Sequence, residues 1–462
     1  MRVLALAALL AAPLRAAPPP GDAQDPAFWP GFAKLTAAHP GRCGVYSLEK
    51  GEEALLARAW LSQQAVKSID VQYFIWSTDN IGVLAAQRLL RAAENGATVR
   101  VLVDDLLLDA GSESVLALAA HPRIEIRVYN PKHSVGVSRA RRLWNIATGF
   151  RAANQRMHDK VFLVDGRVAI IGGRNVAEEY FDYNRTYNFR DRDLLLMGPE
   201  TRRVAEHFEA FWTSALSVPV ETLLPDRMAA MTPERRGAAY RALHRYAADP
   251  ANFAPAPRRA LAELPRRFAA LLGDLVWEKD VTFVGDRPGK NDGSSGLGGG
   301  GGSTSAIAAA VGAARERVVI QSPYLVLSER GLAFFAELAK RADVRIVTNS
   351  FASTDNLAAY SGYRRIRARL LASGVKVFEF KPHPAIERDR IERLDEFGSK
   401  PPIFAIHAKT VVIDRTAVFV GTFNLDPRSA NLNTEVGVLV RGKTLAGRVE
   451  AAILRDIRPE NS

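Results

Sequence analysis

A chain of 462 residues is too long for one ordinary hydrophobic core and suits two domains of roughly 200 residues each. Its composition, 47% hydrophobic and 24% charged, is that of a globular protein and excludes a disordered chain. The net charge of +12 favours an anionic partner, nucleic acid or an anionic membrane surface, and the single cysteine, Cys43, excludes an internal disulfide and a zinc site built on cysteines.

The N-terminal segment has one basic residue, Arg2, before an apolar run from Val3 to Ala12, and then Arg15 among small residues and prolines. The run is too short to span a bilayer but suits the apolar part of a secretory signal. Residues 1–20 are therefore predicted to be a signal peptide or an N-terminal anchor, and the protein is expected to be exported or located in the cell envelope.

A β-α-β unit followed by a third strand is predicted twice, at residues 65–131 and 315–382. Because the two copies keep their order and spacing, they indicate an internal duplication. The predicted fold is α/β, with two halves whose mixed, mostly parallel sheets are flanked by helices. The expected boundaries are a first half at 21–225, a connecting region with a glycine-rich linker at 226–305, and a second half at 306–462.

One charged pattern, His-x-Lys followed five residues later by Asp, occurs once in each half. Its two copies are His158, Lys160 and Asp165, and His407, Lys409 and Asp414. Residues two apart on a strand face the same side, so the His and Lys of each copy point together. Each Asp follows in a predicted hairpin turn, and for Asp165, which precedes a glycine, turn formation explains the residue as well as chemistry does.

Two asparagines, Asn175 and Asn424, each lie 17 residues after the histidine of their half. If the halves face each other, two imidazoles, two ammonium groups and two carboxamides converge in a single shared cleft. This set suits substitution at a phosphodiester, because Lys and Asn stabilise the charge that grows on the non-bridging oxygens. One His attacks phosphorus to give a phosphohistidine, and the other protonates the leaving alkoxide and then activates the incoming hydroxyl.

A nucleophilic imidazole must be neutral with its lone pair forward, which requires a carboxylate at its other nitrogen. Glu435, seven residues before Gly442, is one candidate for this role. Asp191 lies seven residues before Gly198 and is the matching candidate in the first half, with Asp193 as second choice.

These residues make the chain resemble the phospholipase D superfamily, whose signature is two His-x-Lys-x4-Asp motifs, each followed by a Gly-x-x-Asn turn. The resemblance covers about residues 60–455, and both motifs match in full. It implies the family's fold, a phosphohistidine mechanism that needs no metal and no other cofactor, and His158 as nucleophile with His407 as acid and base, although the opposite assignment remains open.

Within the superfamily, the segments 156–182 and 407–435 are similar to bacterial cardiolipin synthases, closest to the C type. Those enzymes move a phosphatidyl group onto the head-group hydroxyl of phosphatidylglycerol. The similarity implies an anionic or zwitterionic phospholipid substrate, contact with a membrane surface, and a place in a bacterial envelope, in the periplasm or peripheral on the inner membrane. Basic and aromatic residues between Asn130 and Arg156 are expected to brace the site or to seat lipid head groups.

Three other functions remain open. A phospholipase D hydrolase has the same site and uses water as acceptor. A nuclease fits the basic charge, yet small nucleases of the superfamily carry one motif and dimerise, so nucleic acid is the less favoured partner. The third is a non-catalytic protein that binds anionic membranes. The presence of every expected site residue argues against it, because such a protein would not need them. The donor lipid, the acceptor alcohol, any partner protein and the oligomeric state are left open by the sequence.

Overall fold

The computed structural model describes residues 24–108, 113–131, 154–252, 263–291 and 293–462. The expected signal or anchor at residues 1–20 lies outside this part of the chain, as does most of the basic and aromatic region between Asn130 and Arg156.

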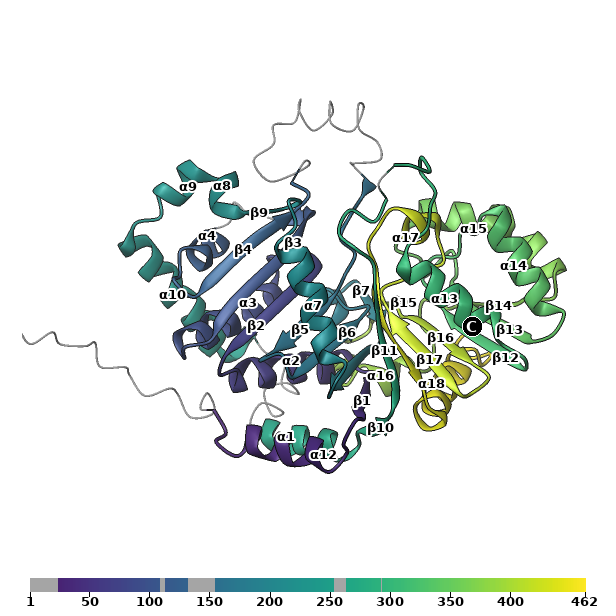
Figure 1. Ribbon diagram of the computed structural model, residues 1–462, viewed down its shortest axis with the longest axis horizontal. Coiled ribbons are helices and arrows are strands. Elements are labelled where there is room, and N and C mark those ends of the chain that lie inside the picture. The colour runs from purple at the N-terminus through teal and green to yellow at the C-terminus, as the bar shows by residue number, and fades with distance from the viewer. Residues whose placement is uncertain (1–23, 109–112, 132–153, 253–262, 292) are drawn as a thin grey trace, which may run out of the picture.

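The first half is built on a nine-stranded sheet of order β10-β1-β8-β6-β5-β2-β3-β4-β9 (Figure 1). Its strands are β1 Cys43–Leu48, β2 Ser68–Trp76, β3 Thr98–Leu108, β4 Ile124–Tyr129, β5 Val161–Val164, β6 Val168–Gly172, β8 Asp193–Met197, β9 Ser217–Pro219 and β10 Val276–Glu278. The helices of this half are α1 Phe28–Ala37, α2 Gly51–Gln64, α3 Asn80–Glu94, α4 Glu113–Ala119, α7 Thr201–Trp212, α8 Val220–Leu223, α9 Pro225–Ala229, α10 Pro233–Ala248 and α12 Leu264–Gly273.

The second half is built on a seven-stranded sheet of order β11-β18-β17-β16-β12-β13-β14. Its strands are β11 Asp280–Gly285, β12 Arg317–Gln321, β13 Asp343–Asn349, β14 Lys376–Phe380, β16 Lys409–Ile413, β17 Ala417–Gly421 and β18 Val436–Arg441. Its helices are α13 Gly302–Gly312, α14 Glu329–Ala339, α15 Leu357–Ala372, α16 Glu387–Arg390, α17 Pro427–Asn431 and α18 Lys443–Asp456.

Both predicted β-α-β units are present, as β2-α3-β3 and β12-α14-β13, and each continues into a third parallel strand. The crossover helices begin alike, because a side-chain oxygen of Asp79 or Ser328 accepts a backbone N–H in the first turn of α3 or α14. The α/β class with mixed sheets is confirmed. The expected majority of parallel strands is wrong, because the parallel strands number three in each sheet and every other neighbour, including the hairpins β5-β6 and β16-β17, pairs antiparallel.

The region 226–305 was expected to connect the two halves through a flexible linker, but its strands are part of both large sheets. β10 pairs with β1 in the first sheet and β11 pairs with β18 in the second, so the segment 276–285 belongs to both. The glycine-rich stretch that follows packs on α17, where Gly300 N–H donates to Asn431 Oδ1 at 3.1 Å. Gly299 and Gly300 both have positive φ, a conformation that glycine adopts without strain and that lets the backbone turn onto α17.

The two halves share a hydrophobic core between their sheets. Leu163 and Ile171 from the first sheet and Val412 and Val420 from the second belong to one cluster of buried side chains, which Val449 of α18 also joins. A two-stranded parallel sheet, β7 Tyr187–Arg190 with β15 Ile403–Ile406, crosses the junction and lies between the two large sheets in Figure 1. The halves are therefore held together at the segments that lead into the predicted site residues.

Candidate active site

The histidine of the second motif is placed by the parallel pairing of β7 with β15. The two strands end in register, Arg190 opposite Ile406, so the next residues, Asp191 and His407, lie side by side. His407 Nδ1 is 2.6 Å from Asp191 Oδ2, and the backbone N–H of His407 donates to the carbonyl of Arg190 at 2.9 Å. The imidazole of the second half is thus oriented by a carboxylate of the first half.

The histidine of the first motif is placed by a matching contact in the other direction. Met157 forms a parallel bridge with Thr434, and His158 N–H donates to the carbonyl of Thr434 at 3.1 Å. His158 Nδ1 consequently lies 2.8 Å from Glu435 Oε2. Each imidazole therefore binds the carboxylate of the opposite half. Sequence spacing points to Glu435 and Asp191 but carries no sign of this exchange, because the strands that create it are far apart in the chain.

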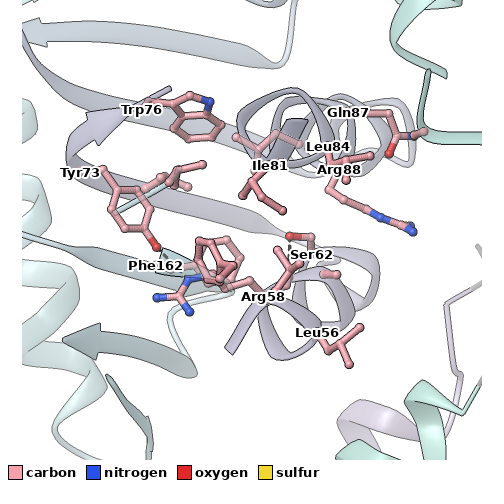
Figure 2. A pocket seen from close by; sticks show the side chains of 18 residues that line it. Leu56, Arg58, Ser62, Tyr73, Trp76, Ile81, Leu84, Gln87, Arg88 and Phe162 are labelled. Atoms are coloured by element: carbon pink, nitrogen blue, oxygen red, sulfur yellow. Dashed lines mark hydrogen bonds between the residues drawn. The ribbon is translucent and has the colours of Figure 1, made fainter. Parts of the chain in front are cut away.

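Asp193, the second choice for an orienting carboxylate, has another partner. Its Oδ2 lies 2.9 Å from Arg58 Nη2 and 3.3 Å from Arg174 Nη1 in a buried ion-pair cluster. An apolar cavity lies beside this cluster, between α2, α3 and β2 (Figure 2). Its lining is mostly aliphatic and aromatic and includes none of the predicted site residues, so the cavity belongs to the core of the first half.

Lys160 and Lys409 are both buried and bound to the backbone beside their histidines. Lys160 Nζ donates to the carbonyl of His158 at 2.7 Å, and Lys409 Nζ donates to that of His407 at 2.5 Å. Burial lowers the pKa of Lys160 to about 7 and that of Lys409 to about 8, although neighbouring carboxylates oppose the shift. An anion entering the site would meet two ammonium groups that have given up most of their water.

The two imidazoles lie in different electrostatic surroundings. Burial, followed by the charges of Lys160 and Lys409, holds the pKa of His158 well below its usual value. Burial and Lys409 also lower the pKa of His407, but there the charge of Asp191 acts in the opposite direction. Of the two rings, His158 is the one kept neutral most strongly.

The two orienting carboxylates differ in the same way. Burial alone would raise the pKa of Asp191, yet the charges of His407 and Lys409 outweigh it and hold that pKa well below its usual range. Burial raises the pKa of Glu435 well above its usual value, against the opposing charge of Lys160. Asp191 is thus a fixed anion, whereas Glu435 depends on its neighbours for its charge.

The side chains of the two asparagines, Asn175 and Asn424, differ in how many hydrogen bonds they already make. Asn175 Oδ1 accepts from Ile75 N–H at 3.1 Å, and its Nδ2 donates to Tyr180 OH at 2.9 Å. The Oδ1 of Asn424 is buried and makes no hydrogen bond within the described part of the chain. Asn175 therefore has one amide hydrogen left to donate to a ligand. The side-chain amide of Asn424 makes fewer hydrogen bonds within the described residues and has more groups left for a ligand.

Asp165 and Asp414 lie apart from the other predicted site residues. Each follows its strand, β5 or β16, at the end opposite the lysine, about 16 Å along the chain at about 3.3 Å a residue. The carboxylate of Asp165 accepts the backbone N–H groups of Val66, Lys67 and Ser68. That of Asp414 accepts those of Arg315, Glu316 and Arg317. The catalytic role predicted from the motif does not match these contacts, which tie each turn to the start of a neighbouring strand.

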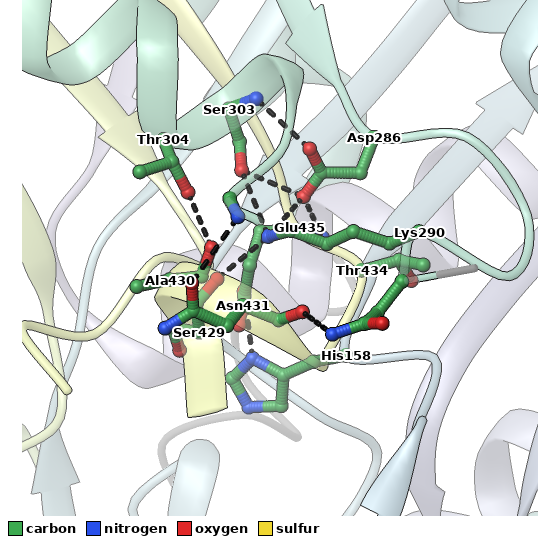
Figure 3. Close-up of polar contacts among 12 residues, drawn as sticks. His158, Asp286, Lys290, Ser303, Thr304, Ser429, Ala430, Asn431, Thr434 and Glu435 are labelled. Atoms are coloured by element: carbon green, nitrogen blue, oxygen red, sulfur yellow. Dashed lines mark hydrogen bonds and ion pairs between the residues drawn. The ribbon is translucent and has the colours of Figure 1, made fainter. Parts of the chain in front are cut away.

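A polar layer behind Glu435 was not predicted from the sequence. Figure 3 shows it, with Asp286, Lys290 and Ser303 on the side of Glu435 away from His158. Asp286 Oδ2 accepts from Glu435 N–H at 3.0 Å and lies 2.8 Å from Lys290 Nζ. Lys290 also donates to the carbonyl of Ser429 at 2.7 Å. Lys290 belongs to the glycine-rich stretch and has no motif around it, so no local signal could have revealed this layer.

Among the described residues, no three His, Cys, Asp or Glu side chains are grouped so that they could hold a metal ion. Within the same residues, every helix is too short or too polar to cross a membrane.

Comparison with known proteins identifies relatives of this chain. The family model described as "Cardiolipin synthase, PLD-like domain" matches residues 61–212 and 307–457, one match in each half. Cardiolipin synthase C of Escherichia coli strain K12 is 33% identical over 430 residues, which is 91% of this chain and 86% of that protein. Cardiolipin synthase A of Pseudomonas aeruginosa strain LESB58 is 27% identical over 414 residues, 89% of this chain and 66% of that protein.

Among solved structures, phosphatidylserine synthase of Haemophilus influenzae Rd KW20 is similar to this fold with a TM-score of 0.55. The match covers 93% of this chain and 91% of that chain at 14% sequence identity, so it bears on the fold alone.

Proposed function

This chain belongs to the PLD-like domain family of the cardiolipin synthases, and from that premise we propose that it is a phosphatidyltransferase that acts on phospholipid phosphodiesters. The observation that carries the proposal is the pair of buried histidines, each bound to a carboxylate of the other half and flanked by a lysine. Such a pair supplies one nucleophile and one proton carrier to the same phosphorus.

In the first step, Nε2 of His158 attacks phosphorus and a P–N bond forms as the P–O bond to the head-group alcohol breaks. His407 gives the proton at its Nε2 to the departing oxygen. His158 suits the nucleophile because its low pKa keeps it neutral, and Glu435 holds the proton at Nδ1 so that the Nε2 lone pair faces the substrate. His407 suits the acid because the anionic Asp191 stabilises its imidazolium form.

In the second step, neutral His407 takes a proton from the hydroxyl of the acceptor, whose oxygen attacks phosphorus. The P–N bond breaks, and His158 returns to its neutral form with the phosphatidyl group on the new alcohol. Through both steps the ammonium groups of Lys160 and Lys409 and the amides of Asn175 and Asn424 bind the non-bridging oxygens, where negative charge develops. A second phosphatidylglycerol as acceptor gives cardiolipin, and water gives phosphatidic acid.

The place of action that fits these substrates is a bacterial membrane surface. The apolar run from Val3 to Ala12 supports export to the periplasm or attachment at the inner membrane. Fractionation of cells that produce the full chain tests this placement, and recovery in the cytosolic fraction alone would contradict it.

Product analysis tests the proposed activity. The purified full chain is incubated with vesicles of labelled phosphatidylglycerol, with or without phosphatidylethanolamine, and the labelled lipids are separated. Cardiolipin is the expected product, whereas phosphatidic acid alone would replace the transferase with a hydrolase, and no turnover of either lipid would reject both. His158→Ala should abolish turnover, and a chelator should leave the wild-type rate unchanged, since no step calls on a metal ion.

A further inference from the structure

Exposed apolar side chains gather on one segment of the second half. Among the described residues five large hydrophobic side chains are exposed, and they are Val66, Leu297, Phe351, Leu357 and Leu371. The last three belong to α15 and the loop before it, with Phe351 65% and Leu357 63% exposed. The ring of Phe351 lies 5.4 Å from that of Tyr360, so the loop residue sits against the helix. Three of these five residues thus lie on one helix and its preceding loop, and such grouping favours an interaction surface over singly scattered exposure.

The exposed side of α15 combines these apolar residues with unpaired positive charge. Leu357, Arg364 and Leu371 are spaced seven apart and therefore lie along one face of the helix, and Arg365 adjoins it. Arg364 and Arg365 are exposed and form no ion pair with any described residue. By contrast, Arg367 and Arg369 of the same helix pair with glutamates of neighbouring elements. The α15 face is defined here as Phe351, Leu357, Arg364, Arg365 and Leu371.

The α15 face begins beside the second histidine. In the loop that leads to it, Ser353 is fully buried and its carbonyl accepts a hydrogen bond from Tyr187 OH of β7, the strand that places Asp191. In the same loop Asp355 accepts from Tyr324 OH at 2.8 Å. Asp355 is also close enough for its charge to act on the pKa of His407 in the upward direction. A surface bound to the α15 face would thus lie next to the site.

We propose that the α15 face docks the protein on a bilayer of anionic phospholipid. Phe351, Leu357 and Leu371 enter the boundary between head groups and acyl chains, while Arg364 and Arg365 bind lipid phosphates at the same depth. The charge fits this partner, since the two arginines form no ion pair within the part of the chain that the structure describes and the sequence carries a net charge of +12. The proposal rests on the proposed function, because a lipid enzyme must draw its substrate from a membrane.

Vesicle sedimentation with the full chain tests the docking. Vesicles of phosphatidylcholine with one third phosphatidylglycerol should bind the wild-type protein, and vesicles of phosphatidylcholine alone should bind it far less. Phe351→Ser with Leu357→Ser, and separately Arg364→Glu with Arg365→Glu, should each weaken binding to the anionic vesicles by about 20-fold or more. The matched controls are Val66→Ser with Leu297→Ser, which are exposed elsewhere, and Arg202→Glu with Arg203→Glu on α7.

A second measurement separates docking from chemistry. Turnover of phosphatidylglycerol in vesicles should fall with binding in the α15-face variants, whereas turnover of a short-chain, monomeric phosphatidylglycerol should keep its wild-type rate. Equal vesicle binding by these variants and the controls would overturn the docking. So would a wild-type dimer that the α15-face variants convert to monomer, since a second copy would then cover the face. Sedimentation needs no turnover, so it judges the docking even if product analysis rejects the proposed activity.

Discussion

At the scale of single residues, Lys160 and Lys409 determine how the site responds to rising pH. Burial lowers their pKa values to about 7 and about 8, and in the proposed mechanism the protonated form binds the phosphodiester. Because each ammonium loses its proton as the pH rises through its pKa, kcat/KM should fall above about pH 7 to 8. Bound phosphate favours the ammonium form, so the corresponding fall in kcat should appear at higher pH. A kcat/KM that stays level from about pH 6 to pH 10 would contradict this reading.

Lys290 should affect how the reaction rate falls at acidic pH, because its charge acts on the pKa of Glu435. The charged and titratable groups that face Glu435 are His158, Lys160, Lys290, Asp286 and Lys409. The charge of Lys290 opposes the rise in the pKa of Glu435 that burial causes. Attack by His158 requires Glu435 as a carboxylate, so a higher pKa means that the competent form is lost at higher pH as the solution is acidified.

Lys290→Met should therefore move the acid limb of phosphoenzyme formation to higher pH by about one unit, whereas Lys290→Arg, which keeps the charge, should leave it in place. The pH dependence of single-turnover rates measures this shift. Lys34→Met removes an exposed lysine far along the sequence and serves as control. An unchanged acid limb in a folded Lys290→Met protein would show that Lys290 only supports the fold.

At the scale of elements, the motif aspartates hold strands together. Asp414 accepts three backbone N–H groups and has φ of +49°, a left-handed conformation that Asp and Asn adopt more readily than Ala. Asp414→Ala should lower the free energy of unfolding by about 2–4 kcal/mol, and Asp414→Asn by less. The exposed Asp395→Ala is the control in the same denaturant titration. The catalytic activity per folded molecule should not change. If Asp414→Ala instead lowered that activity by orders of magnitude while the free energy of unfolding stayed at the wild-type value, Asp414 would have a catalytic role.

The same scale shows what local sequence could and could not predict. The units β2-α3-β3 and β12-α14-β13 and the hairpins after each histidine were predicted, because the strand and helix periods and the turn residues are local signals. The placement of residues 276–291 and 293–301 was not predicted, because it depends on contacts with distant segments, such as Asp286 N–H with the carbonyl of Glu435. The glycines there suggested a flexible linker, although their positive φ values serve a defined path.

At the scale of the whole molecule, the duplication produces one site from two halves. The sequence predicted that imidazoles, ammonium groups, amides and carboxylates of the two halves converge, because both copies keep the same spacing. It could not reveal that Glu435 serves His158 and Asp191 serves His407, since this exchange follows from parallel contacts between the halves. A change in one half should therefore disable the histidine of the other.

Trapping the covalent intermediate tests this account most directly. A labelled phosphatidyl ester of p-nitrophenol, whose leaving group needs no protonation, is mixed with enzyme, quenched in alkali and digested. In the His407→Ala variant the label should accumulate on the peptide that contains His158. Added to that variant, Glu435→Gln should slow labelling by about 100-fold, whereas Asp191→Asn should not slow it. Label on His407 in a His158→Ala protein, or labelling that is indifferent to Glu435, would contradict the exchange of carboxylates and the role of His158.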